Sequence, residues 1–237
     1  MQQKEGEFIE AFRARVQSEV ARVPTDPEGF IAWFEALKDS GPGQWDPLFD
    51  WLATEADLDQ MRWFLTQEAA GEAGFDDMVA MTQVKLPARP KLELARNYWD
   101  EMGRGNMGGM HGPMLDMTVQ GLELTPTIEG TLWQSLALAN TMTAFAATRP
   151  AGLKRVGTAP KLRKYFDLHA VLDVEHSKAW NAEALLPLAT DHPEVLPAIA
   201  EGAIMRLLCG EQCFEAYRAV LWGGAETSHP VHLRQSA

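Results

Sequence analysis

Hydrophobic residues recur three or four positions apart along most of the chain, which is the spacing of a buried face on an α-helix. No segment shows the alternation of apolar and polar residues that a half-buried β-strand requires. Proline and glycine divide the pattern into separate helices. We therefore predict an all-α protein built as a single helical bundle, with helices over residues 8–23, 29–37, 45–56, 61–83, 91–102, 114–122, 127–148, 159–188 and 194–222.

Nothing in this pattern marks a boundary between domains. We expect one helical domain over residues 1–222 and a mobile, polar C-terminal tail over residues 223–237. A glycine-rich stretch at residues 103–112, GRGNMGGMHG, is predicted to be a loop or a broken helix. It contains the spacing GxGxxG, but a dinucleotide-binding βαβ unit needs a strand before the glycines, and an amphipathic helix is expected there instead.

The charge of the chain excludes some classes of partner. The 237 residues carry a formal net charge of −12, whereas nucleic acids and anionic membrane surfaces attract basic proteins. No apolar run approaches the length of a membrane span, and the N-terminus has no signal-peptide core. We expect a cytoplasmic protein that acts on a small-molecule substrate, without nucleic acid or membrane as a partner, and with a homodimer as one assembly to test.

The stretch YFDLHAVLDVEHSKAW, residues 165–180, carries three metal-binding side chains on one predicted helix. His169, Asp173 and His176 are four and then three residues apart, so they project within an arc of roughly 60°. Apolar neighbours such as Leu168 and Leu172 indicate burial, where unpaired ionisable groups are costly. A bound metal ion would remove that cost, and pairing with nearby side chains is the alternative.

Two further stretches carry candidate ligands. In QEAAGEAGFDD, residues 67–77, Glu68 and Glu72 recur four residues apart, although an acidic stripe is also typical of a solvated helix face. In ELARNYWDEMGRGNMGGMHG, residues 93–112, Glu101 ends a helix and His111 follows the glycines. Carboxylates and imidazoles together suit iron, and helical bundles build di-iron sites from inward-facing Glu and His. The Glu-x-x-His pair of ferritin-like bundles is absent, which indicates a different helical scaffold.

Over residues 48–217 these three stretches resemble the haem-oxygenase-like di-iron oxidases and oxygenases, a family of iron-containing redox enzymes. The resemblance implies an all-α bundle of the haem-oxygenase-like or TenA-like type that binds no haem. It also implies a non-haem oxidoreductase with two iron ions, Fe(II) and Fe(III) in turn, with O2 as co-substrate and an unidentified small organic substrate. The metal ligands that it implies are Glu101, His111, His169, Asp173 and His176, together with Glu68 or Glu72, which spacing does not separate.

The chain departs from this family in one segment. The family's third core helix usually brings a further Glu ligand, but residues 133–157 contain no acidic residue. Either the protein lacks that ligand, which would weaken the second iron site, or the sequence omits a helix between Arg149 and Ala151.

An alternative of another class is a metal-independent TenA-like hydrolase, or a small-molecule binding protein, on the same fold. A hydrolase of that kind needs a nucleophilic cysteine. The two cysteines, Cys209 and Cys213, are four residues apart on an apolar predicted helix, where reduced thiols packed in the core are expected.

Overall fold

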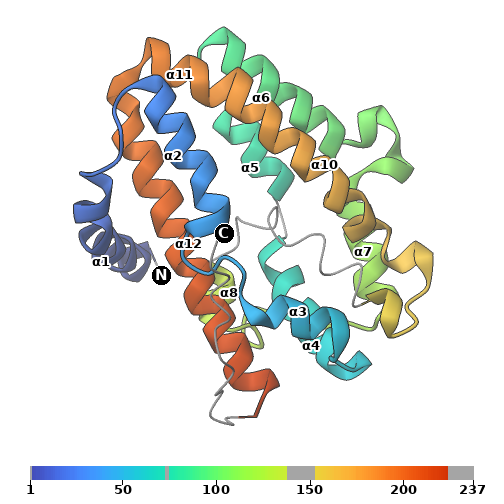
Figure 1. Cartoon of the computed structure of the whole chain (residues 1–237). Helices are drawn as coiled ribbons and strands as arrows, with labels where there is room; N and C mark the ends of the chain where they lie inside the picture. Colours follow the sequence, from blue (N-terminus) through green and yellow to red (C-terminus); the bar gives the residue numbers. More distant parts are fainter. Residues whose placement is uncertain (1, 73–74, 138–152, 224–237) are drawn as a thin grey trace, which may run out of the picture.

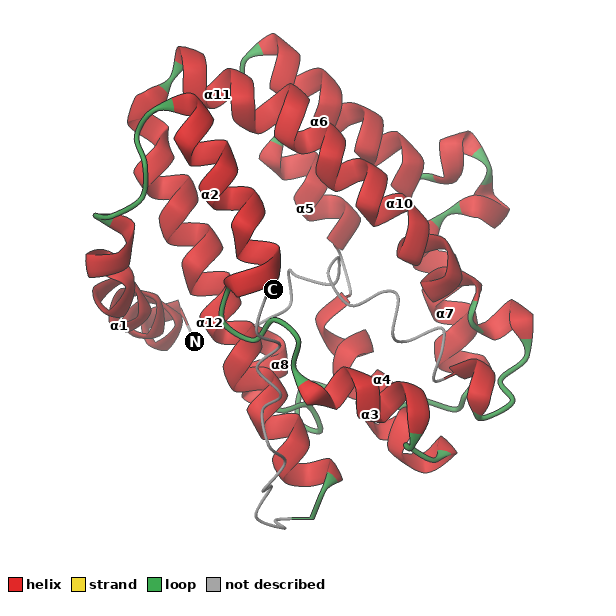
Figure 2. Ribbon diagram, in the orientation of Figure 1, coloured by secondary structure: helices red, strands yellow, loops and turns green. Residues whose placement is uncertain are grey.

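The protein is helical throughout its described part, as Figures 1 and 2 show for a computed structural model. The structure describes residues 2–72, 75–137 and 153–223, without the side chains of residues 2–6, 8 and 71–78. No strand occurs within those ranges, so the all-α prediction is confirmed. The α-helices are α1 (Gln2–Val20), α2 (Pro27–Ser40), α3 (Pro47–Thr54), α4 (Leu58–Glu72), α5 (Phe75–Thr82), α6 (Ala88–Glu101), α7 (His111–Gly121), α8 (Trp133–Ala137), α10 (Lys164–Trp180), α11 (Leu186–Asp191) and α12 (Leu196–Leu221).

Side chains just before several helices fix where those helices begin. Asp26 accepts a hydrogen bond from the backbone N–H of Gly29 at 2.8 Å, and Pro27 occupies the first helical position of α2. Before α4, Asp57 and Gln60 each accept a hydrogen bond from the backbone N–H of the other, both at 2.8 Å. These local signals explain why α2 and α4 begin within three residues of their predicted positions.

Two apolar clusters hold the helices together, and α12 contributes to both. The larger cluster joins α3, α4, α7, α10 and α12, and its largest fully buried side chains are Leu48, Leu52, Met61, Phe64, Leu65, Met114, Leu153 and Tyr217. The smaller one packs α2, α11 and α12 around Phe30, Ala189 and Leu196. Burial of each large apolar side chain contributes about 1.5–3 kcal/mol, so these clusters supply most of the driving force for folding.

Helices α6 and α10 lie side by side at the edge of the molecule, with α7 beside the start of α10 (Figure 1). Both helices carry a stripe of buried polar residues with the same spacing of four and then three positions: Glu93, Asn97 and Asp100 on α6, and His169, Asp173 and His176 on α10. Because this spacing keeps side chains on one face of a helix, two polar stripes meet inside an otherwise apolar packing.

Several predicted helix bounds are wrong, and the helix expected over residues 8–23 spans Gln2–Val20. The helix expected over residues 61–83 is two helices, α4 and α5, on either side of residues 73–74. The helix expected over residues 159–188 is a 3₁₀ turn, η4 (Pro160–Leu162), followed by α10, a π-helical turn, η5 (Asn181–Leu185), and α11. The last helix begins at Leu196, after a 3₁₀ turn, η6 (Pro193–Val195), and not at residue 194.

The helix expected from residue 127 begins at Trp133. Thr127 folds the preceding residues into a turn, because its hydroxyl accepts from the backbone N–H of Gly130 and its carbonyl accepts from the hydroxyl of Thr131. The rest of that expected helix and the expected tail from residue 224 lie outside the described residues. In the described part of the chain, no helix is both long and apolar enough to cross a membrane.

Candidate metal centre

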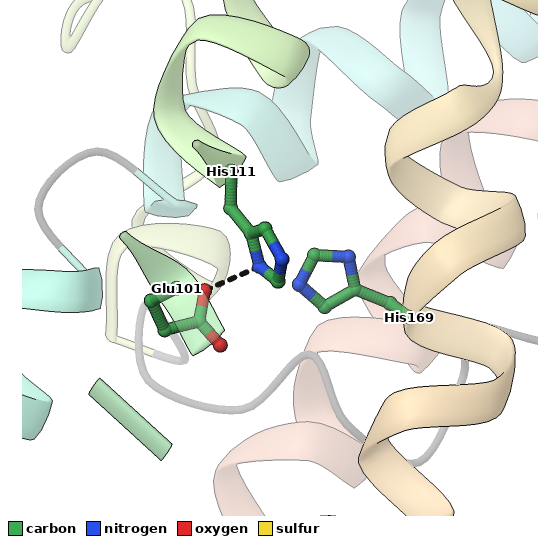
Figure 3. A group of neighbouring side chains, drawn as sticks. All are labelled: Glu101, His111 and His169. Atoms are coloured by element: carbon green, nitrogen blue, oxygen red, sulfur yellow. Dashed lines mark ion pairs between the residues drawn. The ribbon is translucent and has the colours of Figure 1, made fainter. Parts of the chain in front are cut away.

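Three buried side chains from three helices meet at one point, as Figure 3 shows. Glu101 is the last residue of α6, His111 is the first residue of α7, and His169 lies on α10. Each offers one ligand atom, and these atoms lie within 4.8 Å of one another. The three residues are only 4%, 4% and 7% exposed, so bulk water does not solvate them. We refer to Glu101, His111 and His169 as the metal triad.

A tight glycine-rich loop returns the chain from Glu101 to His111. It consists of two 3₁₀ turns, η1 (Gly103–Gly105) and η2 (Met107–Gly109), each closed by backbone hydrogen bonds. Gly103 has φ 61°, and a Cβ atom there would lie 2.5 Å from the backbone nitrogen of Met110. Only glycine fits this close approach at a positive φ. The loop therefore brings His111 back beside the carboxylate of Glu101, with Nδ1 of His111 2.5 Å from Oε2 of Glu101.

His169 is oriented by the backbone of its own helix. Its Nδ1 lies 2.8 Å from the carbonyl oxygen of Tyr165, and the N–H at Nδ1 donates to that oxygen. The lone pair of the ring is then at Nε2, on the opposite side. The rings of Tyr165 and His111 pack against the imidazole, with centroids 4.2 and 4.5 Å away. A histidine whose other nitrogen donates to a backbone carbonyl is the usual form of a metal ligand.

His176, seven residues farther along α10, is in a different environment. Its Nε2 lies 3.0 Å from Oδ2 of Asp100, and its Nδ1 lies 2.5 Å from Nδ2 of Asn97. Oδ1 of Asp100 also accepts from Nε of Arg104 at 2.6 Å. Burial by itself raises the pKa of Asp100, but the hydrogen bonds from Arg104 and His176 outweigh it and hold that pKa below its ordinary value. Asp100 is thus a carboxylate that ties His176 to α6.

The structure brings together three of the residues that the sequence predicted as ligands and leaves the others elsewhere. Asp173 is buried, 7% exposed, one turn beyond His169, but it lies outside the metal triad. Glu68 accepts a hydrogen bond from the hydroxyl of Tyr217 at 2.9 Å, and that hydroxyl also pairs with Ser135. The side chain of Glu72 lies outside the described residues, so the choice between Glu68 and Glu72 stays open.

The chemistry of the metal triad fits a transition-metal ion. Two imidazoles and one carboxylate form the ligand set typical of non-haem Fe(II) enzymes, and they leave coordination positions for other ligands. The short contact between His111 and Glu101 points the same way, because Nδ1 of His111 is buried next to the carboxylate without a hydrogen bond, and a cation bound between the two would satisfy both. Within the described residues, no other group of three or more His, Cys, Asp or Glu side chains gathers as closely.

Sequence reasoning did not single out Asn97, Asp100 and Arg104, which hold His176 and the loop. A signal was present, because Glu93, Asn97 and Asp100 repeat the spacing of His169, Asp173 and His176. Polar residues at that spacing on a helix with an apolar face are expected to lie against a polar partner.

The two cysteines are not placed for nucleophilic catalysis. Cys213 is fully buried, 3.9 Å from the hydroxyl of Ser135, and burial together with the charge of Glu68 raises the pKa of its thiol to about 12. Burial also raises the pKa of Cys209. Since the thiolate is the reactive form, both residues behave as packing groups, as expected from the sequence.

Comparison with known proteins assigns the family. The chain matches the family model described as iron-containing redox enzyme over residues 62–152 and 150–211, which is more than half of its length. The two matched ranges meet at residues 150–152, where the sequence analysis expects relatives to carry an additional helix. No curated protein and no solved structure matches the chain. The matched ranges contain the whole metal triad, and on this match the chain belongs to the iron-containing redox enzyme family, with the all-α, haem-oxygenase-like fold predicted from its sequence.

Proposed function

We propose that this protein is a non-haem iron oxidase or oxygenase that uses O2 to oxidise a small organic substrate. The observation that supports this proposal most directly is the metal triad, two imidazoles and a carboxylate buried together at the meeting point of α6, α7 and α10. Bound iron would supply the electrons for reducing O2, which amino-acid side chains by themselves do not supply.

The protein's own residues supply position and environment. Glu101 provides the negative charge that favours a cation in a buried site, because a carboxylate of 4% exposure is poorly solvated by water. The carbonyl of Tyr165 holds the N–H of His169, so the Nε2 lone pair of His169 is preset for a ligand. The fixed loop after Glu101 presents His111 from the other side.

A second iron ion is part of this proposal. In this proposal its ligands come from the remaining residues that the resemblance implies, Asp173 and His176 on α10 and Glu68 or Glu72 on α4. The burial of Asp173 and His176 on the same helix as His169 supports a second ion, since they are only 7% and 6% exposed.

An anaerobic Fe(II) titration followed by exposure to O2 tests the proposal. We expect the wild-type protein to bind iron and then to consume O2. Glu101→Gln is expected to lose most of its iron, because the amide keeps the shape of the side chain but removes its charge. The matched control is Glu93→Gln on the same helix, whose carboxylate pairs with Arg96 at 2.5 Å instead of facing the metal triad. No iron uptake by the wild type, or equal uptake by the Glu101→Gln variant, would contradict the proposal.

A further inference from the structure

Both ring nitrogens of His176 are engaged by side chains of α6. A neutral imidazole has one N–H and one lone pair, and a metal ion needs the lone pair. The contacts fit one tautomer, in which the N–H at Nε2 donates to Asp100 and the lone pair at Nδ1 accepts from the amide of Asn97. In this arrangement His176 has no lone pair to offer to a metal ion.

Asp100 is held in turn by the glycine-rich loop. Nε of Arg104 donates to Oδ1 of Asp100 at 2.6 Å, and the other carboxylate oxygen faces His176. Arg104 has φ 54°, a left-handed conformation that is unfavourable for a residue with a side chain and persists only where surrounding contacts hold it. The loop that ends at His111 and the helix that carries His176 are therefore linked through one carboxylate. We refer to Asn97, Asp100 and Arg104 as the latch.

We propose that the latch positions His176 out of metal coordination, so that the first metal ion binds at the metal triad alone. A second ion that uses His176 binds only after the hydrogen bonds from Asn97 and Asp100 break. This inference rests on the proposed function, since it assumes that the metal triad binds a metal ion. Asn97, Asp100 and Arg104 act through His176 and are positioning residues.

The latch makes the two ions unequal. Opening it breaks one hydrogen bond to a neutral amide and one to a charged carboxylate, and it leaves buried Asp100 with one partner fewer. Each of these changes weakens binding of the second ion and leaves binding of the first ion unchanged. We expect the second ion to bind at least about 10-fold more weakly than the first.

Zn(II) titration of ¹⁵N-labelled protein, followed by NMR of the histidine rings, tests this directly. Zn(II) is diamagnetic, does not react with O2 and accepts imidazole and carboxylate ligands. Before zinc is added, His176 is expected to show the Nε2–H tautomer. The first equivalent is expected to shift the ring signals of His111 and His169 and to leave those of His176 unchanged. The His176→Ala variant assigns its signals.

Two variants weaken the latch, and a third variant serves as a matched control. Asn97→Ala frees the Nδ1 lone pair of His176, so the second zinc ion is expected to bind about tenfold more tightly while the first is unchanged. Arg104→Ala loosens Asp100 and is expected to produce a smaller increase, and its side chain is 70% exposed, so the substitution leaves no cavity in the core. Arg96→Ala removes the same charge from an ion pair with Glu93 on the same helix and is expected to change neither ion.

The outcomes separate the latch from the metal centre. Movement of the His176 signals together with those of His169 at the first equivalent would overturn the latch and leave the metal triad intact. An unchanged second affinity in both Asn97→Ala and Arg104→Ala would also overturn it. If excess zinc moved the signals of neither His111 nor His169, the metal centre itself would be refuted.

Discussion

Two histidines on one helix, His169 and His176, are both buried to a similar extent, 7% and 6% exposed, yet they face opposite chemical situations. His169 donates its N–H to a backbone carbonyl and keeps its lone pair directed toward Glu101 and His111. His176 gives both nitrogens to side chains of α6. The comparison teaches that burial and residue type alone do not distinguish two histidines whose ring nitrogens have different partners.

The neighbouring helix decides the difference. Beside the start of α10, helix α6 has ended and the glycine-rich loop leads into α7. The imidazole of His111, at the start of α7, therefore faces His169. Two turns later α10 packs against α6 itself, where Asn97 and Asp100 occupy the positions that open coordination sites would need. In the proposed function the first region binds an ion, while the second region joins α10 to α6.

The largest effect is expected from a substitution in the glycine-rich loop, which holds His111 next to His169. Gly103→Ala adds a Cβ at φ 61° against the backbone at Met110, which should displace His111. We expect a loss of about 1–3 kcal/mol in the free energy of unfolding and an Fe(II) affinity about 10–100-fold lower. Chemical denaturation and anaerobic titration measure the two quantities.

The control for this change is Gly112→Ala, next to His111. A Cβ at Gly112 meets no atom within 4 Å, so this variant should keep both its stability and its Fe(II) affinity. Equal losses in the two glycine variants would show that the loop has no special part in presenting His111.

The stability of the metal-free protein tests whether His176 has a structural role that His169 lacks. His176→Ala leaves Asp100 and Asn97 buried without their imidazole partner, so the free energy of unfolding should fall by about 2–3 kcal/mol. His169→Ala should cost less, because its hydrogen bond to the carbonyl of Tyr165 lies within α10 and does not join α10 to α6. Denaturant unfolding of the two apo variants compares them, and a greater loss in His169→Ala would contradict the structural role of His176.

The smallest effect is expected for alkylation of Cys213, the thiol that the hydrolase alternative would need as its nucleophile. With its pKa raised to about 12 by burial, the thiol remains protonated below that pH, and the thiolate that reacts with alkylating reagents is scarce. Iodoacetamide at pH 8 should therefore leave Cys213 unmodified in native protein, with or without iron, and modify it after unfolding. Rapid modification of the native thiol would favour the hydrolase alternative.

The sequence predicted the fold class, and its seven candidate ligands include the three residues of the metal triad, because both predictions depend on local patterns. Helical periodicity identifies helices, and His169 and the pair formed by Glu101 and His111 stand out by residue type and spacing. Spacing also put His176 on the stripe of His169, and it does lie there. Seven residues of helix, however, separate the two by about 10 Å, so each meets a different part of α6 or α7.

The remaining features depend on contacts between distant segments. Spacing did not separate Glu68 from Glu72 as a ligand, and it did not indicate that Glu68 accepts a hydrogen bond from Tyr217, 149 positions away in the sequence. The late start of α8 at Trp133 depends on hydrogen bonds of Thr127 that compete with helix formation. The spacing of hydrophobic residues does not reveal such hydrogen bonds.

The central claim, that the two ends of α10 have different roles, is tested most directly by anaerobic Fe(II) binding to His169→Ala and His176→Ala side by side with the wild type. We expect His169→Ala to lose the tightly bound ion, with an affinity at least about 100-fold lower, since a ligand matters more than the groups that support it. His176→Ala should retain that ion at nearly wild-type affinity. Loss of the first ion in both variants to the same degree, or in neither, would contradict the account.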